Sequence, residues 1–187
     1  MKNTLGIIHA LLSLELDKIQ DGQARSIFLD SIARIQSISQ VYQQLYDTSG
    51  LHNIDLKHYI EEMSHQLLHT YQQKPGTLRL SLKLDEVTLD MKRAMNIGII
   101  LNELLINVIK YAFPSGNGGE ISIVLNRKDK DINLTVSDDG RGLGADFHDN
   151  KGKGMGLNLV DSLARKMDGV FALESQKGTT ARLIIPL

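Results

Sequence analysis

A polar row inside an apolar segment is the first part of this 187-residue sequence that suggests chemistry. In "NELLINVIKYAF", Glu103, Asn107 and Lys110 stand at positions i, i+4 and i+7, so they share one face of a helix. Tyr111 follows Asn107 by four residues and lies close to the same side. A carboxylate, an amide oxygen and an ammonium in this order can orient a water molecule, hold Mg²⁺ and meet a phosphate. A solvated helix face is the plainer interpretation, but the apolar flanks indicate a largely buried helix and favour a site.

The segment "VSDDGRGL" places an acidic residue at the end of a predicted strand. Asp138 offers a directional acceptor, which suits an amino group such as the exocyclic amine of adenine. Gly140 and Gly142 let the backbone pass close to a flat ring, since neither carries a side chain. Asp-Gly pairs are also ordinary turn residues, so this segment alone is a weak indication.

The segment "GKGMGLNLV" opens a predicted helix with Gly152, Gly154 and Gly156. Free backbone N–H groups at a helix N-terminus bind phosphate, and glycines permit close approach. The spacing fits neither a dinucleotide-binding fingerprint nor a P-loop. A flexible loop before a glycine-rich helix start explains this stretch alone equally well.

The elements that must position these residues follow a helical hairpin. Apolar residues repeat every three to four positions from Leu5 to Ile19, with a second stripe beside them, and again from Ala24 to Leu45. The breaker pair Asp21-Gly22 separates the two runs. Two helices cannot cover that much apolar surface by themselves, so we expect residues 1–47 to form an antiparallel hairpin that dimerises into a four-helix bundle. A hairpin folded back on its own chain is the less favoured alternative.

A turn-rich linker at residues 47–55 marks the predicted domain boundary. Beyond it, the periodicity predicts helices at 56–73, 91–113 and up to about 167, and strands at 78–84, 87–89, 120–126, 132–137, 170–174 and 180–185. The sequence therefore predicts an α+β chain. Its second domain, residues 48–187, is expected to be an α/β sandwich with a mixed sheet of about five strands and helices over one face.

The composition excludes several classes of partner. The net charge of −1 gives no electrostatic case for binding nucleic acid or an anionic membrane. The sequence has no cysteine, which excludes disulfides and thiol catalysis and is typical of a reducing compartment. No apolar run reaches the ~20 residues of a membrane span, and no signal peptide is visible. We expect a cytoplasmic chain without membrane contact.

The order of the three polar segments resembles the Bergerat-type ATP-binding fold of the GHKL group, which includes histidine kinases, gyrase-like ATPases, Hsp90 and MutL. "NELLINVIKYAF" looks like its asparagine box, "DDGRGL" and "GKGMGLNLV" like its two glycine boxes, and "KGTT" like its closing element. The resemblance implies ATP and Mg²⁺ as cofactors. It implies catalytic roles for Glu103, the general-base candidate, and Asn107, which is also the Mg²⁺ ligand and part of the nucleotide site.

The same resemblance implies the remaining nucleotide contacts. Asp138 would bind adenine, with Thr179 as the second adenine contact, and Lys110 and Tyr111 would lie on the phosphate and ribose side. The glycine boxes would supply the rest of the binding residues: Gly140, Gly142, Gly152, Lys153, Gly154, Met155, Gly156 and Leu157. Residues 143–151 would form a short mobile lid.

Over nearly its whole length the chain resembles bacterial two-component sensor histidine kinases of the HisKA_2/HWE-like branch. In that branch the phosphoaccepting histidine begins a His-Arg-x-Lys-Asn motif, of which Lys2 and Asn3 match the last two residues. The histidine would stand three positions before Lys2, ahead of Met1, so we expect this chain to bind nucleotide but not to phosphorylate itself. His9 falls on the apolar stripe of the first helix and is better explained as a core residue.

The resemblance implies transfer of the γ-phosphoryl group of ATP to a histidine and relay to an aspartate of a response regulator. It also implies a homodimer through residues 3–46 and an upstream sensor domain in the parent protein. Two alternatives remain. A GHKL serine kinase of the anti-sigma-factor type needs no bundle hairpin, and a non-enzymatic dimeric phosphorelay scaffold would not need the intact ATP-binding segments.

Overall fold

The computed structural model describes residues 21–22, 24–25, 28–29, 32, 35, 39, 53–71, 77–114, 118–143 and 155–187. The chain divides into two compact units, Met1–Leu51 and His52–Leu187. In the first unit, the described residues between Gly22 and Ser39 are helical, and Asp21 caps this helix because its Oδ1 accepts a hydrogen bond from the Ala24 N–H at 3.2 Å. The first predicted helix, including His9, lies outside the described residues.

The second unit is built on a five-stranded sheet in the order β2-β4-β5-β7-β6. The strands are β2 (Leu78–Leu84), β4 (Gly119–Lys128), β5 (Asp131–Asp138), β6 (Val170–Gln176) and β7 (Gly178–Pro186). β2 pairs with β4 in parallel, and every other pairing is antiparallel. A separate two-stranded sheet joins β1 (Ile54–Asp55) to β3 (Thr88–Leu89). The predicted mixed sheet is confirmed.

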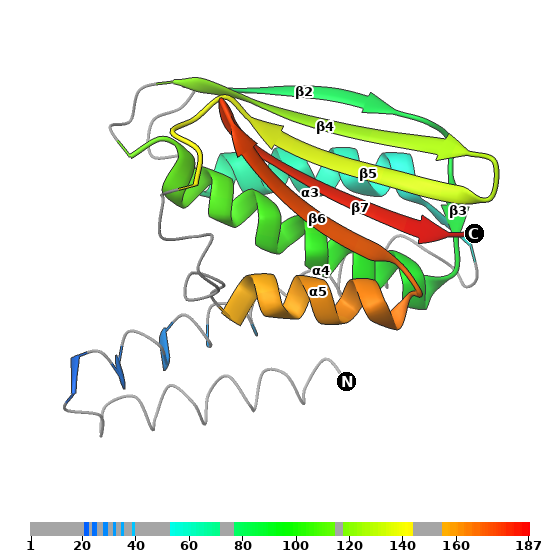
Figure 1. Cartoon of the computed structure of the whole chain (residues 1–187), viewed down its shortest axis with the longest axis horizontal. Helices are drawn as coiled ribbons and strands as arrows, with labels where there is room; N and C mark the ends of the chain where they lie inside the picture. The colour runs from blue at the N-terminus through cyan, green and yellow to red at the C-terminus, as the bar shows by residue number, and fades with distance from the viewer. Residues whose placement is uncertain are drawn as a thin grey trace. The chain divides into compact units, whose positions relative to one another are not determined.

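The helices α3 (Leu56–Tyr71), α4 (Met91–Asn107) and α5 (Met155–Lys166) cover one face of the sheet (Figure 1). Alternation along the strands produces this arrangement, because every second residue of β5, namely Ile132, Leu134 and Val136, is at most 2% exposed. The intervening β5 residues are half-buried or exposed on the other face. The α+β class and the helices over one face are therefore also confirmed.

Helix α4 is the central helix of this layer. Asp90 caps its start, with the side-chain oxygen accepting a hydrogen bond from the Arg93 N–H at 3.0 Å. The segment Met91–Ala112 is long and apolar enough to cross a membrane, but 67% of its most apolar stretch is buried inside the domain, as in the core helix of a soluble protein. At Val108 the helix changes to a π-helix, η1 (Val108–Ala112). The predicted helix over 91–113 is thus observed, with a π-helical last turn.

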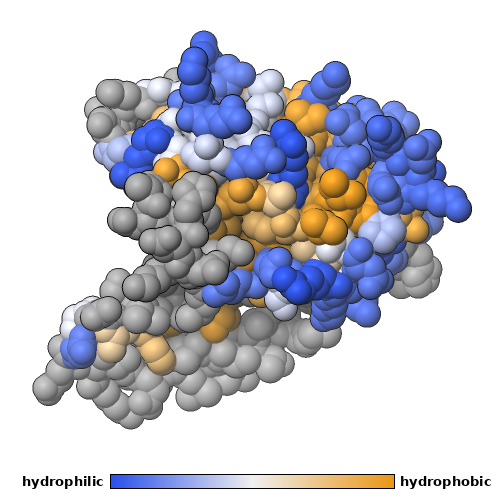
Figure 2. Space-filling model, in the orientation of Figure 1, coloured by the Kyte–Doolittle hydropathy of each residue, from blue (hydrophilic) through white to orange (hydrophobic). Residues whose placement is uncertain are grey.

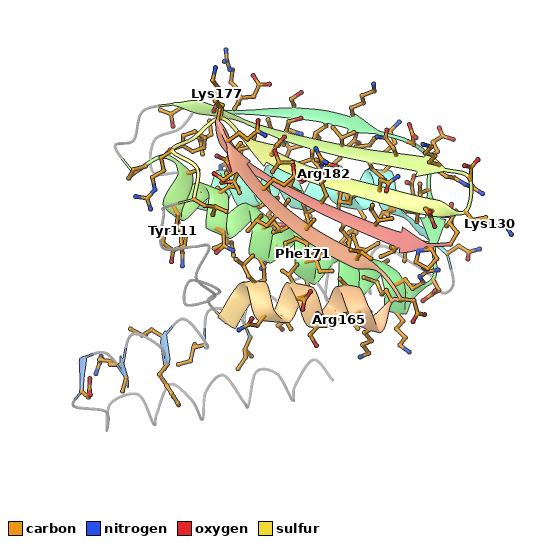
Figure 3. All side chains as sticks on the ribbon, viewed as in Figure 1. Tyr111, Lys130, Arg165, Phe171, Lys177 and Arg182 are labelled. Atoms are coloured by element: carbon orange, nitrogen blue, oxygen red, sulfur yellow. The ribbon has the colours of Figure 1, made fainter. Side chains whose placement is uncertain are left out.

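Strand β6 is one edge of the sheet, and α5 packs against it. Its residues Phe171 and Leu173 are half-buried, while Val170 is 65% exposed. Figure 2 shows hydrophobic surface in the middle of this face, between hydrophilic regions on either side, and Figure 3 labels Phe171 in the same part of the view. The apolar core therefore reaches the surface along this edge.

Candidate functional site

The carboxyl group of Asp138 is buried at the end of β5. It is 6% exposed, and its Oδ1 accepts a hydrogen bond from the Gly140 N–H at 2.9 Å. Thr179 donates two further hydrogen bonds to this carboxyl, from its backbone and from its side chain. Burial nevertheless raises the pKa of Asp138 above its usual value, and the neighbouring charge of Asp139 acts in the same direction. The fold thus holds a desolvated acceptor at the position that the sequence predicts.

The neighbouring Asp139 has a different environment. Its side chain is exposed and its Oδ1 accepts a hydrogen bond from the Glu120 N–H at 2.7 Å, which fastens the end of β5 to β4. One of two adjacent carboxylates is therefore buried beside the glycine turn, while the other holds the sheet together. Successive side chains along a strand point to opposite faces of the sheet, so Asp138 is buried and Asp139 is exposed.

The turn that follows Asp138 packs against the end of the π-helix. A Cβ placed on Gly140 would lie 2.5 Å from the Ala112 oxygen and 2.6 Å from the Ala112 Cβ. The Arg141 N–H donates a hydrogen bond to the same Ala112 oxygen at 3.0 Å. Gly140 is thus needed for this close approach. Residues far apart in the sequence, the end of "NVIKYA" and the start of "DDGRGL", lie side by side.

The polar row of α4 leads to this contact. Glu103 is 4% exposed and Asn107 is half-buried, whereas Lys110 and Tyr111 are exposed. The solvated-face interpretation is therefore wrong for Glu103. Beyond Asn107 the π-helical turn advances each residue by a smaller angle than an α-helix does, so the α-helical spacing that put Lys110 on the same face no longer applies. Single π-helical turns occur frequently at functional sites.

The turn between β6 and β7 packs against Asp138 as well. Gly178 has a φ of +80°, and a Cβ on it would lie 1.8 Å from the backbone carbonyl oxygen of Asp138. The start of β7 therefore packs directly on the Asp138 backbone. This approach explains how Thr179 reaches the Asp138 carboxyl. In Figure 3, Tyr111 and Lys177 lie toward the same end of the sheet, opposite Lys130 in the β4–β5 turn.

Ser175, which the sequence analysis did not single out, joins these two turns. Its Oγ accepts a hydrogen bond from the Leu143 N–H at 2.9 Å and donates one to the Gly178 oxygen at 3.0 Å. Ser175 is half-buried, and its position in "ALESQ" fits an ordinary alternating strand. No signal in the sequence distinguishes it from other strand serines.

Part of the predicted site lies outside the described residues. This applies to Gly152, Lys153 and Gly154, and to residues 144–151 of the predicted lid. Helix α5 starts at Met155, Gly156 is buried and Leu157 is half-buried. Among the residues that the structure does describe, no group of three or more His, Asp or Glu side chains could hold a metal ion alone. Asn107 offers one half-buried amide oxygen, a ligand type that Mg²⁺ accepts beside phosphate and water oxygens.

Comparison with known families gives two matches along the chain. The family model described as "Histidine kinase-, DNA gyrase B-, and HSP90-like ATPase" matches residues 92–187, and the model described as "Histidine kinase" (HisKA_2) matches residues 1–71. The first match spans α4 to β7 and so contains Glu103, Asn107, Asp138 and Thr179.

Two curated relatives illustrate the similarity. The sensor histidine kinase PdtaS of Mycobacterium tuberculosis is 27% identical over 191 residues, which cover 100% of this chain and 38% of the relative. The blue-light-activated histidine kinase 2 of Erythrobacter litoralis is 23% identical, over 96% of this chain and 54% of the relative. The chain thus spans about two fifths to one half of the length of these relatives.

Solved structures share the fold. The histidine kinase domain of the Erythrobacter litoralis EL346 blue-light-activated histidine kinase superposes with a TM-score of 0.74 at 19% identity, covering 99% of this chain and 94% of that one. The Acinetobacter baumannii histidine kinase AdeS superposes with a TM-score of 0.60 at 16% identity, covering 98% and 95%. Because the ATPase model matches residues 92–187, the chain belongs to the histidine kinase-, DNA gyrase B- and HSP90-like ATPase family, and its residues 1–71 match the histidine kinase model.

Proposed function

We propose that residues 48–187 bind ATP with Mg²⁺ and that the chain is the catalytic core of a sensor histidine kinase. The observation that carries this proposal is the buried Asp138 carboxyl, held by Gly140 and Thr179 at the end of β5. A buried carboxyl group in a turn region, with its pKa raised by desolvation, is a candidate for ligand binding. An acceptor in this setting matches a planar base that presents an amino group.

In this proposal the adenine ring lies against the glycine turn, with its amino group toward Asp138 and Thr179. Asn107 supplies the protein oxygen for Mg²⁺, which neutralises charge on the phosphates when bound. Lys110 and Tyr111 are on the ribose and phosphate side. The glycine-rich segment that leads into α5 provides N–H groups for the phosphates: Gly152, Lys153, Gly154, Met155, Gly156 and Leu157.

Glu103 is the residue that we assign to proton handling. It lies one turn before Asn107 on α4 and is 4% exposed, so its carboxylate has a fixed position relative to the Mg²⁺ ligand. Phosphoryl transfer depends mainly on positioning and charge neutralisation. A single oriented carboxylate that accepts a proton from the attacking imidazole is sufficient for such a site.

The reaction we propose is transfer of the γ-phosphoryl group to a histidine imidazole, followed by relay to a receiver-domain aspartate of a response regulator. Dimerisation through residues 3–46, an upstream sensor domain and a cytoplasmic location belong to the same proposal. The match of residues 1–71 to the histidine kinase family supports it over a serine kinase of the anti-sigma type, which has no use for such a segment.

A nucleotide titration with a matched pair of variants tests the proposal. Asp138→Asn keeps the shape of the side chain but replaces one acceptor oxygen with a donor that opposes the adenine amine. An unpaired polar group in a desolvated contact costs about 1–3 kcal/mol, so we expect ADP to bind about ten- to a hundredfold more weakly. Calorimetric titration with ADP, with and without Mg²⁺, measures this.

Asp139→Asn is the control, because it makes the same chemical change one residue away on an exposed side chain and retains an oxygen for the Glu120 N–H. Its affinity for ADP should equal that of the unmodified chain. Equal affinities of all three proteins, or no binding of ADP by the unmodified chain, would show that Asp138 is not an adenine-binding residue.

A further inference from the structure

We propose that Ser175 is a positioning residue of the nucleotide site, which fixes the glycine turn after Asp138 to the β6–β7 turn that carries Thr179. This inference rests on the proposed function, since the site that it positions is the nucleotide site. Ser175 itself is not assigned a contact with the nucleotide.

The hydroxyl of Ser175 makes two hydrogen bonds. As an acceptor it takes the Leu143 N–H at 2.9 Å, across 32 residues of sequence, and as a donor it bonds the Gly178 oxygen at 3.0 Å. Both bonds are part-buried. A serine hydroxyl can donate one bond and accept others, so both bonds form at the same time.

The surroundings of this hydroxyl leave little space for movement. Gly142 has a φ of +72°, and a Cβ on it would lie 2.6 Å from the Ser175 Oγ. Gly178, on the other side, packs on the Asp138 backbone. Because Gly142 has no Cβ, its backbone comes close to the Ser175 hydroxyl, and because Gly178 has none, its backbone comes close to that of Asp138.

These contacts close a ring around the adenine-binding carboxyl. Asp138 accepts from Gly140, the turn continues to Leu143, and Leu143 is bonded to Ser175. Ser175 is bonded to Gly178, and the next residue, Thr179, donates back to Asp138. Without Ser175 the ring is open, and the hydrogen bonds described for the turn are then those of Gly140 to Asp138 and of Arg141 to Ala112.

The position of Leu143 gives the ring its functional meaning. Leu143 is the last residue of the glycine turn before the segment that leads to Gly152 and α5. Fixing Leu143 therefore fixes the end of the glycine turn on the adenine side of the proposed site. If the turn is already fixed without ligand, nucleotide binding loses less conformational entropy than if the turn must become ordered on binding.

Three variants of the full chain test this. Ser175→Ala removes both bonds, and we expect ADP to bind about tenfold more weakly, the effect of losing roughly one well-formed hydrogen bond of preorganisation. Ser175→Thr keeps a hydroxyl and should restore most of the affinity. Ser122→Ala, which removes a half-buried hydroxyl of β4 that takes no part in the ring of hydrogen bonds, should leave the affinity unchanged.

Amide hydrogen exchange separates positioning from general stability. In Ser175→Ala without nucleotide, the Leu143 amide should exchange about tenfold faster, while amides in the middle of β5 exchange as in the unmodified chain. Unchanged ADP affinity in Ser175→Ala, no recovery in Ser175→Thr, or an equal loss in Ser122→Ala would overturn the assignment of Ser175 while leaving nucleotide binding intact. An unmodified chain that does not bind ADP would overturn both proposals.

Discussion

At the scale of single residues, Asp138 shows a conflict between folding and binding. Its pKa is raised chiefly by burial, which the hydrogen bonds from Gly140 and Thr179 only partly offset. The ionised carboxylate is therefore less favourable in the folded protein than in the unfolded chain. A ligand that donates to this carboxylate would remove part of that cost, so the residue is better suited to the bound state than to the free one.

This conflict predicts a pH-dependent effect of Asp138→Asn on stability. Because the pKa of Asp138 is higher in the folded than in the unfolded chain, its protonated form favours folding. This contribution to the free energy of unfolding is complete below the pKa of the unfolded chain, about 3.9 for Asp, and is lost as pH rises through the pKa of the folded chain. In the absence of nucleotide, the variant should thus gain stability relative to the unmodified chain between acidic and neutral pH. Urea unfolding of both proteins at a series of pH values measures the difference. A variant that is progressively less stable than the unmodified chain toward neutral pH would contradict the interpretation.

The placement of Asp138 could be predicted from the sequence because it depends on local order: an alternating strand, its last inward residue, then a glycine turn. Its contact with adenine stays a prediction. Ser175 could not be predicted. Its two bonds depend on the placement of a turn 32 residues away, and its own segment reads as ordinary alternating strand. The contact of Gly140 with Ala112 of the π-helix was also not predicted, and its contact with a flat ring stays a prediction.

At the scale of elements, the packing of α3 on α4 depends on one glycine. Gly98 lies on α4 where a Cβ would be 1.9 Å from the Tyr59 hydroxyl and 2.8 Å from its Cζ. Tyr59 is 6% exposed, burial raises the pKa of its hydroxyl, and this hydroxyl has no hydrogen-bond partner among the described residues. The two helices thus approach closely at the expense of one unsatisfied polar group.

A double-mutant cycle follows from this contact. Gly98→Ala should destabilise the second unit by about 1–3 kcal/mol through overpacking, despite the better helix propensity of alanine. Tyr59→Phe removes the unsatisfied hydroxyl and should be neutral or stabilising. Because the closest clash is with that hydroxyl, Gly98→Ala should cost less in the Tyr59→Phe background, a non-additivity of the kind that neighbouring residues show. Thermal and urea unfolding give the four free energies, and strict additivity would exclude the contact.

The type and order of the longer elements in the second unit followed from periodicity, but their limits did not. Strand β1 (Ile54–Asp55) lies inside the predicted linker 47–55 and was not predicted. β4 runs from Gly119 to Lys128 and β7 from Gly178 to Pro186, each longer than the apolar alternation predicts. Backbone pairing continues beyond the apolar residues because the partner strand is present, whatever the side chains are. The π-helical turn after Asn107 was likewise not predicted, since it depends on how the end of α4 packs against the turn at Gly140.

At the scale of the whole molecule, we expect the first unit to form the dimer and the second unit to bind nucleotide. A chain shortened to Asn53–Leu187 keeps all strands and α3, α4 and α5. We expect it to fold, to be a monomer and to bind ADP like the full chain, whereas the full chain should be a homodimer through residues 3–46. Sedimentation of both proteins, with ADP titration, measures the two properties.

Leu12→Asp in the full chain is the matched control, because it places a charge on the predicted apolar stripe without shortening the chain. It should dissociate the dimer and leave ADP binding intact. A monomeric full chain, or a dimeric shortened chain, would refute the assignment of dimerisation to residues 3–46.

The parallel pairing of β2 with β4 has a consequence for the order in which the sheet assembles. β4 and β5 are joined by the tight turn at Asp129 and Lys130 and can pair within microseconds as a local hairpin. β2 can pair with β4 only after the intervening chain, with β3 and α4, has crossed the sheet. It then has a neighbour on one side only. We therefore expect β2 to join the sheet after the β4–β5 hairpin has formed, by a non-local closure through the same helix that carries Glu103 and Asn107.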